Sequence, residues 1–179
     1  MIRSLTAVLL TILIAIPSAY AEFIPLLPTK TPLLAYVVDG DTIAVRIERD
    51  IEKVRLIGID TPESRKNERA TLQSERSQRD IKTIIEFGRQ AKEALKELLP
   101  KGTELRIEYD VRKRDKYGRL LGYVYTRDNV MVNEQMVLQG YAQLLTIPPN
   151  VKYVDRFKKA LAKSQKEKRG LWASGGFNN

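Results

Sequence analysis

The stretch that decides the fold is LLAYVVDGDTIAVRIERDIEKVRLIGID, residues 33–60. Two runs rich in β-branched residues, 33–39 and 42–48, flank an Asp-Gly-Asp turn. An Asp-Gly pair between two such runs predicts a hairpin. A second polar turn leads to a third strand over 53–60, whose Leu-Ile-Gly-Ile run is apolar on both faces, as in a buried strand. Three strands in close succession indicate an antiparallel meander.

The remainder of the chain adds helices and two further strands. From periodicity and turn signals we predict a helix over 81–99, strands over 103–109 and 120–125, and helices over 130–138 and 151–168. The order β-β-β-α-β-β-α-α is that of a barrel of the OB type. The predicted fold class is therefore mainly β with helices (α+β), a five-stranded Greek-key OB-fold barrel with three helices.

The segment 64–80 is crowded with charge and has little apolar content, so we predict a long exposed loop. Two interpretations of its cations stay open: an extension of a phosphate-binding surface, or a solvated mobile loop. The residues concerned are Arg65, Lys66, Arg69, Arg76 and Arg79. Gly88 interrupts the helical pattern that follows and weakens the case for one unbroken helix.

The composition excludes several chemistries. Of 179 residues, 31 are Lys or Arg and 22 are Asp or Glu, a formal net charge of +9, and there is no His and no Cys. The absence of His excludes Ser-His-Asp arrangements and His-liganded zinc. The absence of Cys excludes thiolate nucleophiles, disulfides and iron–sulfur clusters. Chemistry must rely on carboxylates, hydroxyls, Lys, Arg, Tyr, backbone groups or a metal held by oxygen.

The N-terminus has the layout of a secretory signal peptide over residues 1–21. Arg3 precedes an apolar run over 5–16, and Ala19-Tyr20-Ala21 forms a small-x-small cleavage site. An uncleaved N-terminal anchor is the alternative interpretation. Cleavage would leave 158 residues with a net charge of +8, and we expect a secreted or periplasmic protein without stable membrane association.

The expected mature chain is one domain. Residues 22–32 contain three prolines and read as an extended lead-in. The domain spans 33–173, and residues 174–179 form a tail that we expect to be frayed. We expect a monomer.

Two carboxylates at strand ends suggest a metal site. Asp41 and Asp60 both lie at ends of predicted strands, where a barrel can bring them together. With the Thr61 carbonyl and water they would make an all-oxygen site suited to Ca²⁺. Mn²⁺ and Mg²⁺ also bind such sites. The bland alternative is that Asp-Gly-Asp is simply a hairpin turn and Asp-Thr-Pro-Glu a capped strand exit.

Three further residues complete a site for phosphodiester hydrolysis. Glu63 is a third carboxylate, able to act as general base on a water molecule. Arg55 and Arg119 are permanently charged and match phosphate geometry. Arg55 lies inside an apolar strand, where a charge needs a partner. Metal, base and arginines together suffice for the attack of water on a phosphodiester.

These motifs resemble the thermonuclease, or staphylococcal nuclease-like, family, over about residues 33–172. The matching segments stand in the family's order: Val38-Asp39-Gly40-Asp41-Thr42, Val54-Arg55-Leu56, Asp60-Thr61-Pro62-Glu63, Asp115-Lys116-Tyr117-Gly118-Arg119 and Val132-Asn133-Glu134. The resemblance implies an OB-fold and Ca²⁺-dependent hydrolysis of DNA and RNA to 3′-phosphate ends. It implies calcium ligands at Asp41, Asp60 and Thr61, catalytic residues at Arg55, Glu63 and Arg119, and nucleotide-phosphate contacts at Lys116 and Tyr117.

One segment departs from the family pattern. The family's prototype has tyrosines that stack on the nucleotide, whereas residues 144–149 here read LLTIPP and contain no aromatic side chain. Stacking is worth about 1–3 kcal/mol per base, so we expect weaker or differently placed base contacts. Tyr141 and Tyr153 are the candidate substitutes.

The leading hypothesis is a secreted Ca²⁺-dependent nuclease with little sequence specificity, acting on DNA, RNA or both. The positive charge suits a polyanionic substrate, since phosphate contacts supply most non-specific affinity. The alternative is a non-catalytic OB-fold module that binds nucleic acid. A third possibility is an exported barrel that binds an anionic polymer or membrane.

Overall fold

The structure, a computed structural model, describes residues 31–177. The predicted signal peptide, most of the predicted lead-in and residues 178–179 lie outside the described residues. Within residues 31–177 no helix is both long and apolar enough to cross a bilayer.

The N-terminal meander forms as predicted. Strands β1 (Leu33–Asp39), β2 (Thr42–Ile47) and β3 (Asp50–Leu56) pair antiparallel in succession. The third predicted strand is divided, because Gly58 adopts a φ of 82° and the chain leaves the sheet as a separate short strand, β4 (Gly58–Asp60). Such a φ favours glycine. This division carries Asp60 out of the first sheet.

The two strands after the long helix complete the sheet. Strand β6 (Leu120–Thr126) pairs parallel with β3, and β5 (Leu105–Glu108) pairs antiparallel with β6. The strand order is β1-β2-β3-β6-β5, and β4 forms a second sheet with β7 (Gln143–Leu145). The protein is thus an α+β fold with a five-stranded sheet.

The prediction of a closed barrel is wrong, because β1 and β5 do not form a ladder. They meet at one isolated bridge between Leu33 and Glu104, supported by a backbone bond of 2.9 Å from Leu34 to Thr103. The other backbone bonds between these segments are those from Gly102 to Leu34 and from Leu105 to Pro32, so the contact involves only the start of β1. The strand β7, which we did not predict, instead extends the structure beside β4.

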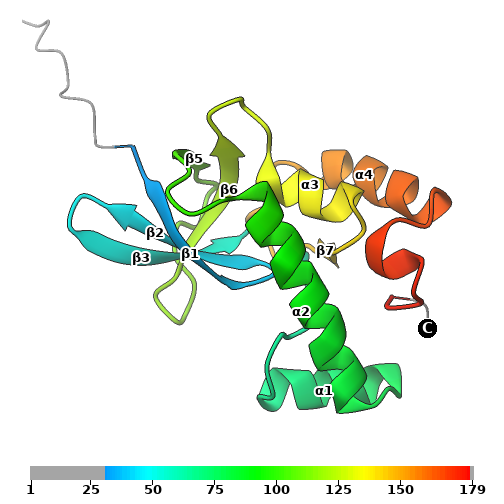
Figure 1. The fold of residues 1–179 in the computed structure, drawn as a ribbon. Helices are drawn as coiled ribbons and strands as arrows, with labels where there is room; N and C mark the ends of the chain where they lie inside the picture. The colour runs from blue at the N-terminus through cyan, green and yellow to red at the C-terminus, as the bar shows by residue number, and fades with distance from the viewer. Residues whose placement is uncertain (1–30, 178–179) are drawn as a thin grey trace, which may run out of the picture.

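The predicted count of three helices is also wrong. Three helices match the prediction in place: α2 (Ile81–Leu98), α3 (Val132–Leu138) and α4 (Val154–Lys166). The fourth is α1 (Glu68–Ser77), which lies across the lower end of α2 within the segment we predicted as a loop (Figure 1). A short 3-10 helix, η2 (Gly170–Trp172), follows α4.

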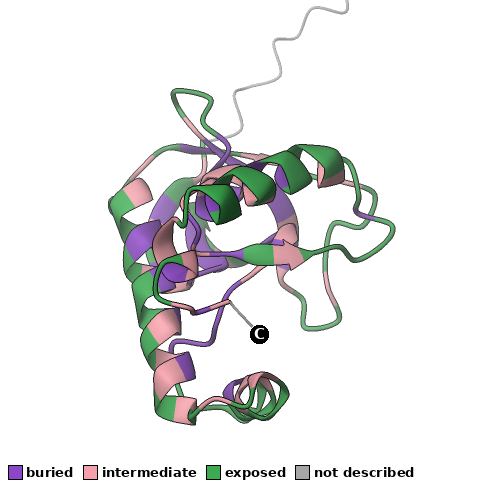
Figure 2. Cartoon of the chain, turned by 90° about the vertical axis from the view of Figure 1, so that its right-hand side faces the viewer, coloured by how far each residue is buried: buried purple, intermediate pink, exposed green. Residues whose placement is uncertain are grey.

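Helix α1 forms without an apolar face. The Asn67 side chain caps its first turn by accepting from the Ala70 amide at 2.8 Å, and Glu68 stands near the positive end of the helix dipole. Ala70 is the only buried residue of α1, and the helix is mostly exposed in Figure 2. Periodicity could not reveal α1, since it is held by polar contacts.

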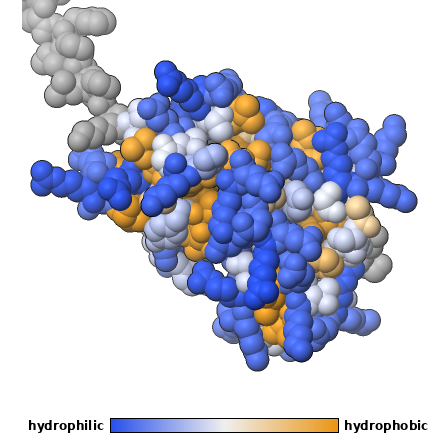
Figure 3. All heavy atoms as spheres, in the orientation of Figure 1, coloured by the Kyte–Doolittle hydropathy of each residue, from blue (hydrophilic) through white to orange (hydrophobic). Residues whose placement is uncertain are grey.

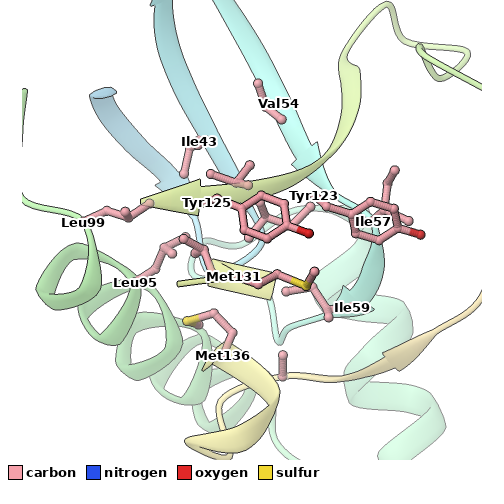
Figure 4. Packing of buried hydrophobic residues seen from close by; sticks show 14 of the residues in the cluster. Ile43, Val54, Ile57, Ile59, Leu95, Leu99, Tyr123, Tyr125, Met131 and Met136 are labelled. Atoms are coloured by element: carbon pink, nitrogen blue, oxygen red, sulfur yellow. The ribbon is translucent and has the colours of Figure 1, made fainter. Parts of the chain in front are cut away.

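The hydrophobic core lies between the sheet and helices α2 and α3. Ile43 and Val54 from the strands, Leu95 of α2 and Met136 of α3 belong to one cluster of buried side chains, which also contains Tyr123 (Figure 4). The outer surface in the view of Figure 3 is largely hydrophilic, with small apolar patches. The core thus fixes the strand ends from which the candidate site residues project.

Candidate active site

Asp41 stands at the turn between β1 and β2 and is buried, with 4% of its surface exposed. Its Oδ1 accepts from the Thr42 hydroxyl at 2.8 Å and its Oδ2 from the Thr61 amide at 3.4 Å. The backbone oxygen of Asp41 accepts from the Leu56 amide at 2.9 Å. The hairpin turn is therefore fastened both to the end of β3 and to the chain beyond β4.

Arg55 lies at the end of β3 and is 6% exposed. Its Nη1 donates to the carbonyl oxygens of Leu56 at 3.0 Å and Ile59 at 2.8 Å. Its Nη2 lies 3.0 Å from Asp41 Oδ2 and 2.8 Å from Asp60 Oδ1. The expectation that this buried charge needs a partner is confirmed, and the guanidinium joins the two carboxylates that we predicted as metal ligands.

Two glycines allow the segment 60–63 to lie against the rest of the fold. A Cβ on Gly40 would come within 2.8 Å of Thr61 Oγ1, and one on Gly88 within 2.3 Å of the Glu63 carbonyl oxygen. Real Cβ atoms do not approach so closely. Gly88, which weakened the helix prediction, is therefore the point where α2 passes directly against the Glu63 backbone.

Helix α1 holds the same segment from the other side through three polar side chains. Gln73 bridges two backbone groups, Asn67 holds one oxygen of Glu63, and Arg69 joins two carboxylates. The contacts are Gln73 Nε2 to Thr61 O at 3.2 Å, Glu63 N to Gln73 Oε1 at 3.0 Å, Asn67 Nδ2 to Glu63 Oε2 at 2.8 Å, Arg69 Nε to Glu63 Oε1 at 3.2 Å and Arg69 Nη2 to Asp60 Oδ1 at 2.8 Å. The sequence pattern gave no role to Asn67 or Gln73 and left that of Arg69 open.

Burial governs the acidity of these carboxyl groups. Burial raises the pKa of Asp60 above its ordinary value, although the charge of Arg55 acts in the opposite direction. Burial likewise raises the pKa of Glu63, against the hydrogen bond from Asn67 and the charge of Arg69. A carboxylate with a raised pKa is a stronger proton acceptor, as a general base requires.

The predicted motif over residues 115–119 is a tight turn organised by Asp115. Its Oδ1 accepts from the amides of Tyr117 at 2.9 Å and Arg119 at 3.0 Å, and its Oδ2 accepts from Arg119 Nε at 2.7 Å. Gly118 supplies the positive φ that the turn needs. Lys116 and Tyr117 stand at the exposed tip. The turn thus holds the Arg119 side chain through a charged hydrogen bond.

The predicted arginines share one cavity of about 450 Å³. Its polar wall is strongly basic and includes a single acidic residue, Asp115. The basic residues are Arg55, Arg69, Arg112, Lys116 and Arg119. Such a cavity suits a phosphate group.

The other wall of this cavity is aliphatic. It is formed by Leu145, Ile147, Pro148 and Pro149 of the segment that lacks aromatic residues. Asn150 ties this wall to the basic one, since its side chain and the Arg112 backbone exchange two hydrogen bonds of 2.8 Å. Tyr141 and Tyr153, the candidate stacking residues, are not among those that line the cavity, and the Tyr153 hydroxyl donates to Glu108 at 2.9 Å.

The structure therefore brings together most of the predicted site. Asp41, Arg55, Asp60, Arg69 and Glu63 form a continuous chain of ion pairs. Of the other predicted residues, Thr61 adjoins this chain through the bond from its amide to Asp41, while Lys116, Tyr117 and Arg119 line the same cavity as Arg55 and Arg69. Asp41, Asp60, Thr61 and Glu63 are not among the residues that line that cavity.

The donor set can be tested against a calcium ion. Asp41 and Asp60 converge, because one oxygen of each lies within 3.0 Å of the same Arg55 nitrogen. Residues 31–177 contain no group of three or more acidic, His or Cys side chains that could hold a metal. The two carboxylates have the hard oxygen chemistry that Ca²⁺ takes in proteins. The third candidate ligand, the Thr61 carbonyl oxygen, accepts a hydrogen bond from Gln73 Nε2 at 3.2 Å.

The chain was compared with known proteins. Residues 53–174 match the family described as "Staphylococcal nuclease homologue". The match contains every predicted site residue except Asp41, which precedes it. Two similar proteins are thermonucleases: that of Staphylococcus hyicus is 33% identical over 138 residues, and that of Staphylococcus intermedius is 34% identical over 140 residues.

The coverage of these matches differs. They take in 77% and 78% of this chain, and 73% and 74% of the two thermonucleases. A third similar protein, the SPbeta prophage-derived endonuclease YokF of Bacillus subtilis, is 37% identical over 142 residues. That match covers 78% of this chain but 43% of the Bacillus protein, so the chain corresponds to less than half of that relative's length.

Proposed function

Because the chain belongs to the staphylococcal nuclease homologue family, we propose that it is a calcium-dependent nuclease. It hydrolyses phosphodiester bonds of DNA and RNA with little sequence specificity and leaves 3′-phosphate ends. The observation that carries the proposal is the ion-paired chain from Asp41 to Glu63 beside a cavity lined by four arginines and a lysine. General base, candidate metal ligands and phosphate-binding groups thus lie in one region.

The candidate metal ligands are Asp41, Asp60 and the carbonyl oxygen of Thr61. When bound, calcium would supply Lewis-acid stabilisation of the negative charge that develops on the phosphoryl oxygens. The protein's part is to hold the two carboxylates at one point, which the hydrogen bonds from Thr42 and Arg55 do.

The chemical step needs a proton acceptor and positive charge. Glu63 accepts a proton from the water that attacks phosphorus, and its position is fixed by Asn67 and by its own backbone bond to Gln73. The water oxygen forms a bond to phosphorus while the bond from phosphorus to the 5′ oxygen breaks. The 5′ oxygen then takes up a proton, and the phosphate stays on the 3′ oxygen. Arginine side chains stabilise the charge on the pentacoordinate species.

The aliphatic wall supports the low sequence specificity. Leu145, Ile147, Pro148 and Pro149 offer apolar contact but no side-chain hydrogen bond to a base edge. Apolar contact of this kind accepts any base. Most charged groups of the cavity are cations suited to the phosphate, which DNA and RNA share.

Export is part of the proposal. It rests on the signal-peptide layout of residues 1–21, and the mature form would act as a monomer outside the cytoplasm without stable membrane association. A precursor and a shorter mature form, separated by mass spectrometry of fractionated host cells, would support it. A full-length protein confined to the cytoplasm would contradict it.

The nuclease proposal is tested by digestion of plasmid and of RNA with calcium or with EGTA. We expect cleavage in calcium only, and ends that a polymerase extends only after phosphatase treatment. Glu63→Gln should lower kcat about a hundredfold or more. Glu93→Gln is the matched control, because Glu93 is an exposed carboxylate paired with Lys96 on α2. Binding without cleavage would instead support the non-catalytic module.

A further inference from the structure

A second cavity, of about 200 Å³, shares no lining residue with the cavity of about 450 Å³ that contains Arg55 and Arg119, which we call the basic cavity. The walls of the second cavity come from α1, the link between α1 and α2, residues 60–62, β7 and residues 176–177. Asp60 lines the second cavity, and its neighbour Ile59 lines the basic one. The linings of the two cavities are therefore continuous along the chain at this point.

The short sheet of β4 and β7 carries both cavities. Gly58 pairs with Leu145, and both line the basic cavity, whereas Asp60 pairs with Gln143, and both line the second cavity. Side chains two residues apart on a strand face the same side, and two residues advance the strand by about 7 Å. A polymer that lies along this ladder therefore passes from one cavity into the other within about one repeating unit of an extended nucleic-acid strand.

Arg76 gives the second cavity a positive charge that no protein group neutralises. The other arginine of the cavity, Arg79, has a structural contact, since its Nη1 donates to the carbonyl oxygen of Gly176. Arg76 is exposed in the last turn of α1, and its guanidinium forms no hydrogen bond or ion pair with any residue of the range 31–177. Such a group matches the geometry of a phosphate.

The remainder of the second cavity suits more than a lone anion. Its apolar lining comes from Pro62, Ile84 and Phe177. The Phe177 ring packs on Trp172, with centroids 5.0 Å apart, so its place in the wall is supported from behind. Aromatic and apolar side chains accept the faces of sugars and bases irrespective of sequence. The lining thus combines a cation for a phosphate with apolar contact for the nucleoside attached to it.

We propose that the second cavity is a further nucleotide subsite, in which Arg76 contacts the phosphate next to the one that is cleaved. The substrate strand lies along the β4–β7 ladder, with one side of the scissile bond in the basic cavity and the other side in the second cavity. The inference rests on the proposed nuclease function. It also decides, for Arg76, between the two interpretations that the sequence left open for the cations of residues 64–80.

Three small substrates separate the two cavities. They are the thymidine dinucleotide dTpdT and its forms with one extra phosphate at the 5′ end or at the 3′ end, so each contains a single phosphodiester bond. We would measure kcat/KM in calcium for wild type, Arg76→Ala and Arg76→Glu, and check folding by circular dichroism. Lys82→Ala is the matched control, because it removes an exposed positive charge near the same link but lines neither cavity.

A terminal phosphate that enters the second cavity should raise wild-type kcat/KM about five- to tenfold over dTpdT. Arg76→Ala should lose this gain at one end of the dinucleotide and keep any gain at the other end, which lies toward the basic cavity. Arg76→Glu should turn the gain into a loss. Cleavage of dTpdT, which lacks the contacted phosphate, should fall much less in either variant. Lys82→Ala should behave as wild type on all three substrates.

Binding gives a second measurement that does not depend on cleavage. Anisotropy of a fluorescent oligothymidylate in EGTA, over a range of salt concentrations, reports how many phosphates the protein contacts. Arg76→Ala should lower the slope of log affinity against log salt by about 0.7, the value for one contact to a single strand, and Lys82→Ala should leave it unchanged.

Several results would overturn the inference. Equal losses of kcat/KM on all three substrates in Arg76→Ala would indicate a general effect on folding or catalysis. A wild-type protein that gains nothing from either terminal phosphate, an unchanged salt slope in Arg76→Ala, or an equal effect in Lys82→Ala would also refute the subsite. A wild-type protein that binds but does not cleave would refute the nuclease proposal, and the salt slope would still decide on Arg76. A wild-type protein that does not bind would refute both.

Discussion

Gly88→Ala is the substitution for which helix propensity and the close approach in the structure predict opposite results. Gly88 lies in the middle of α2. In an unobstructed helix, alanine is more stable than glycine by about 0.5–1 kcal/mol. Here the added methyl carbon would lie 2.3 Å from the carbonyl carbon and oxygen of Glu63 and 2.5 Å from the amide nitrogen of Ser64.

The clash should outweigh the gain in propensity. Additional carbon atoms in a filled interior cost about 1–3 kcal/mol, and the obstructing atoms are backbone atoms that cannot rotate away, so we take the upper end. The net loss is then roughly 2 kcal/mol. For a chain of this size that lowers Tm by roughly 4–8 °C. Because the displaced backbone belongs to Glu63, cleavage should fall further than the loss of folded protein explains.

Thermal and urea unfolding measure the first effect, and kcat at a temperature where the variant is fully folded measures the second. Gln90→Ala is the control, since Gln90 is exposed on the same helix and should change stability by less than about 0.5 kcal/mol. A Gly88→Ala protein as stable as the wild type or more so would show that α2 does not press on the Glu63 backbone, and would refute the reasoning.

Two further predictions concern groups away from the cavity. Burial alone would raise the pKa of Glu108, but hydrogen bonds from Lys152, Tyr153 and Tyr125 hold it below its ordinary value of 4.5. The ionised form therefore stabilises the fold fully above that pH, and the stabilisation is lost as the pH falls through the lower folded value. Glu108→Gln should lower Tm near pH 7, with a difference from wild type that narrows toward pH 3; a difference independent of pH would contradict this. Asn133 is fully buried. Its Oδ1 accepts from the Val124 amide at 2.9 Å, and its Nδ2 donates to the carbonyl oxygens of Ile57 at 2.9 Å and Gly122 at 3.2 Å. Asn133→Ala should cost roughly 2–4 kcal/mol in urea unfolding because buried backbone groups lose their partners, whereas Asn129→Ala, at an exposed turn, should cost far less.

The sequence predicted well what local pattern controls. The Asp-Gly turn, the alternation in β5 and the apolar spacing of α2 each depend on residues within one segment, and each element formed. Arg55 could be singled out because a charge inside an apolar strand requires a partner. Which partners it has depends on where β4 leaves the sheet, and the positive φ of Gly58 sets that point.

Features that depend on polar contacts between distant segments could not be predicted. Helix α1 buries only Ala70, so its sequence carries no apolar periodicity, and its order comes from bonds to residues 60–63. The sequence showed the charge of Arg69 but not the two carboxylates that orient it. Sheet closure likewise depends on pairing between β1 and β5, which lie far apart in the sequence and meet only at the Leu33–Glu104 bridge, and no local pattern reveals that.

The parallel pairing of β3 with β6 has a consequence for how the protein is made. Val54 pairs with Leu120, so the sheet joins parts of the chain that leave the ribosome far apart in time. Asp41, Arg55 and Glu63 are all synthesised before Arg119. A nascent or prematurely terminated chain that ends before Arg112 carries Asp41, Asp60 and Glu63 but lacks Arg112, Lys116 and Arg119 of the cavity. Assembly of the site therefore has to wait for the second half of the chain, which delays its completion during biosynthesis.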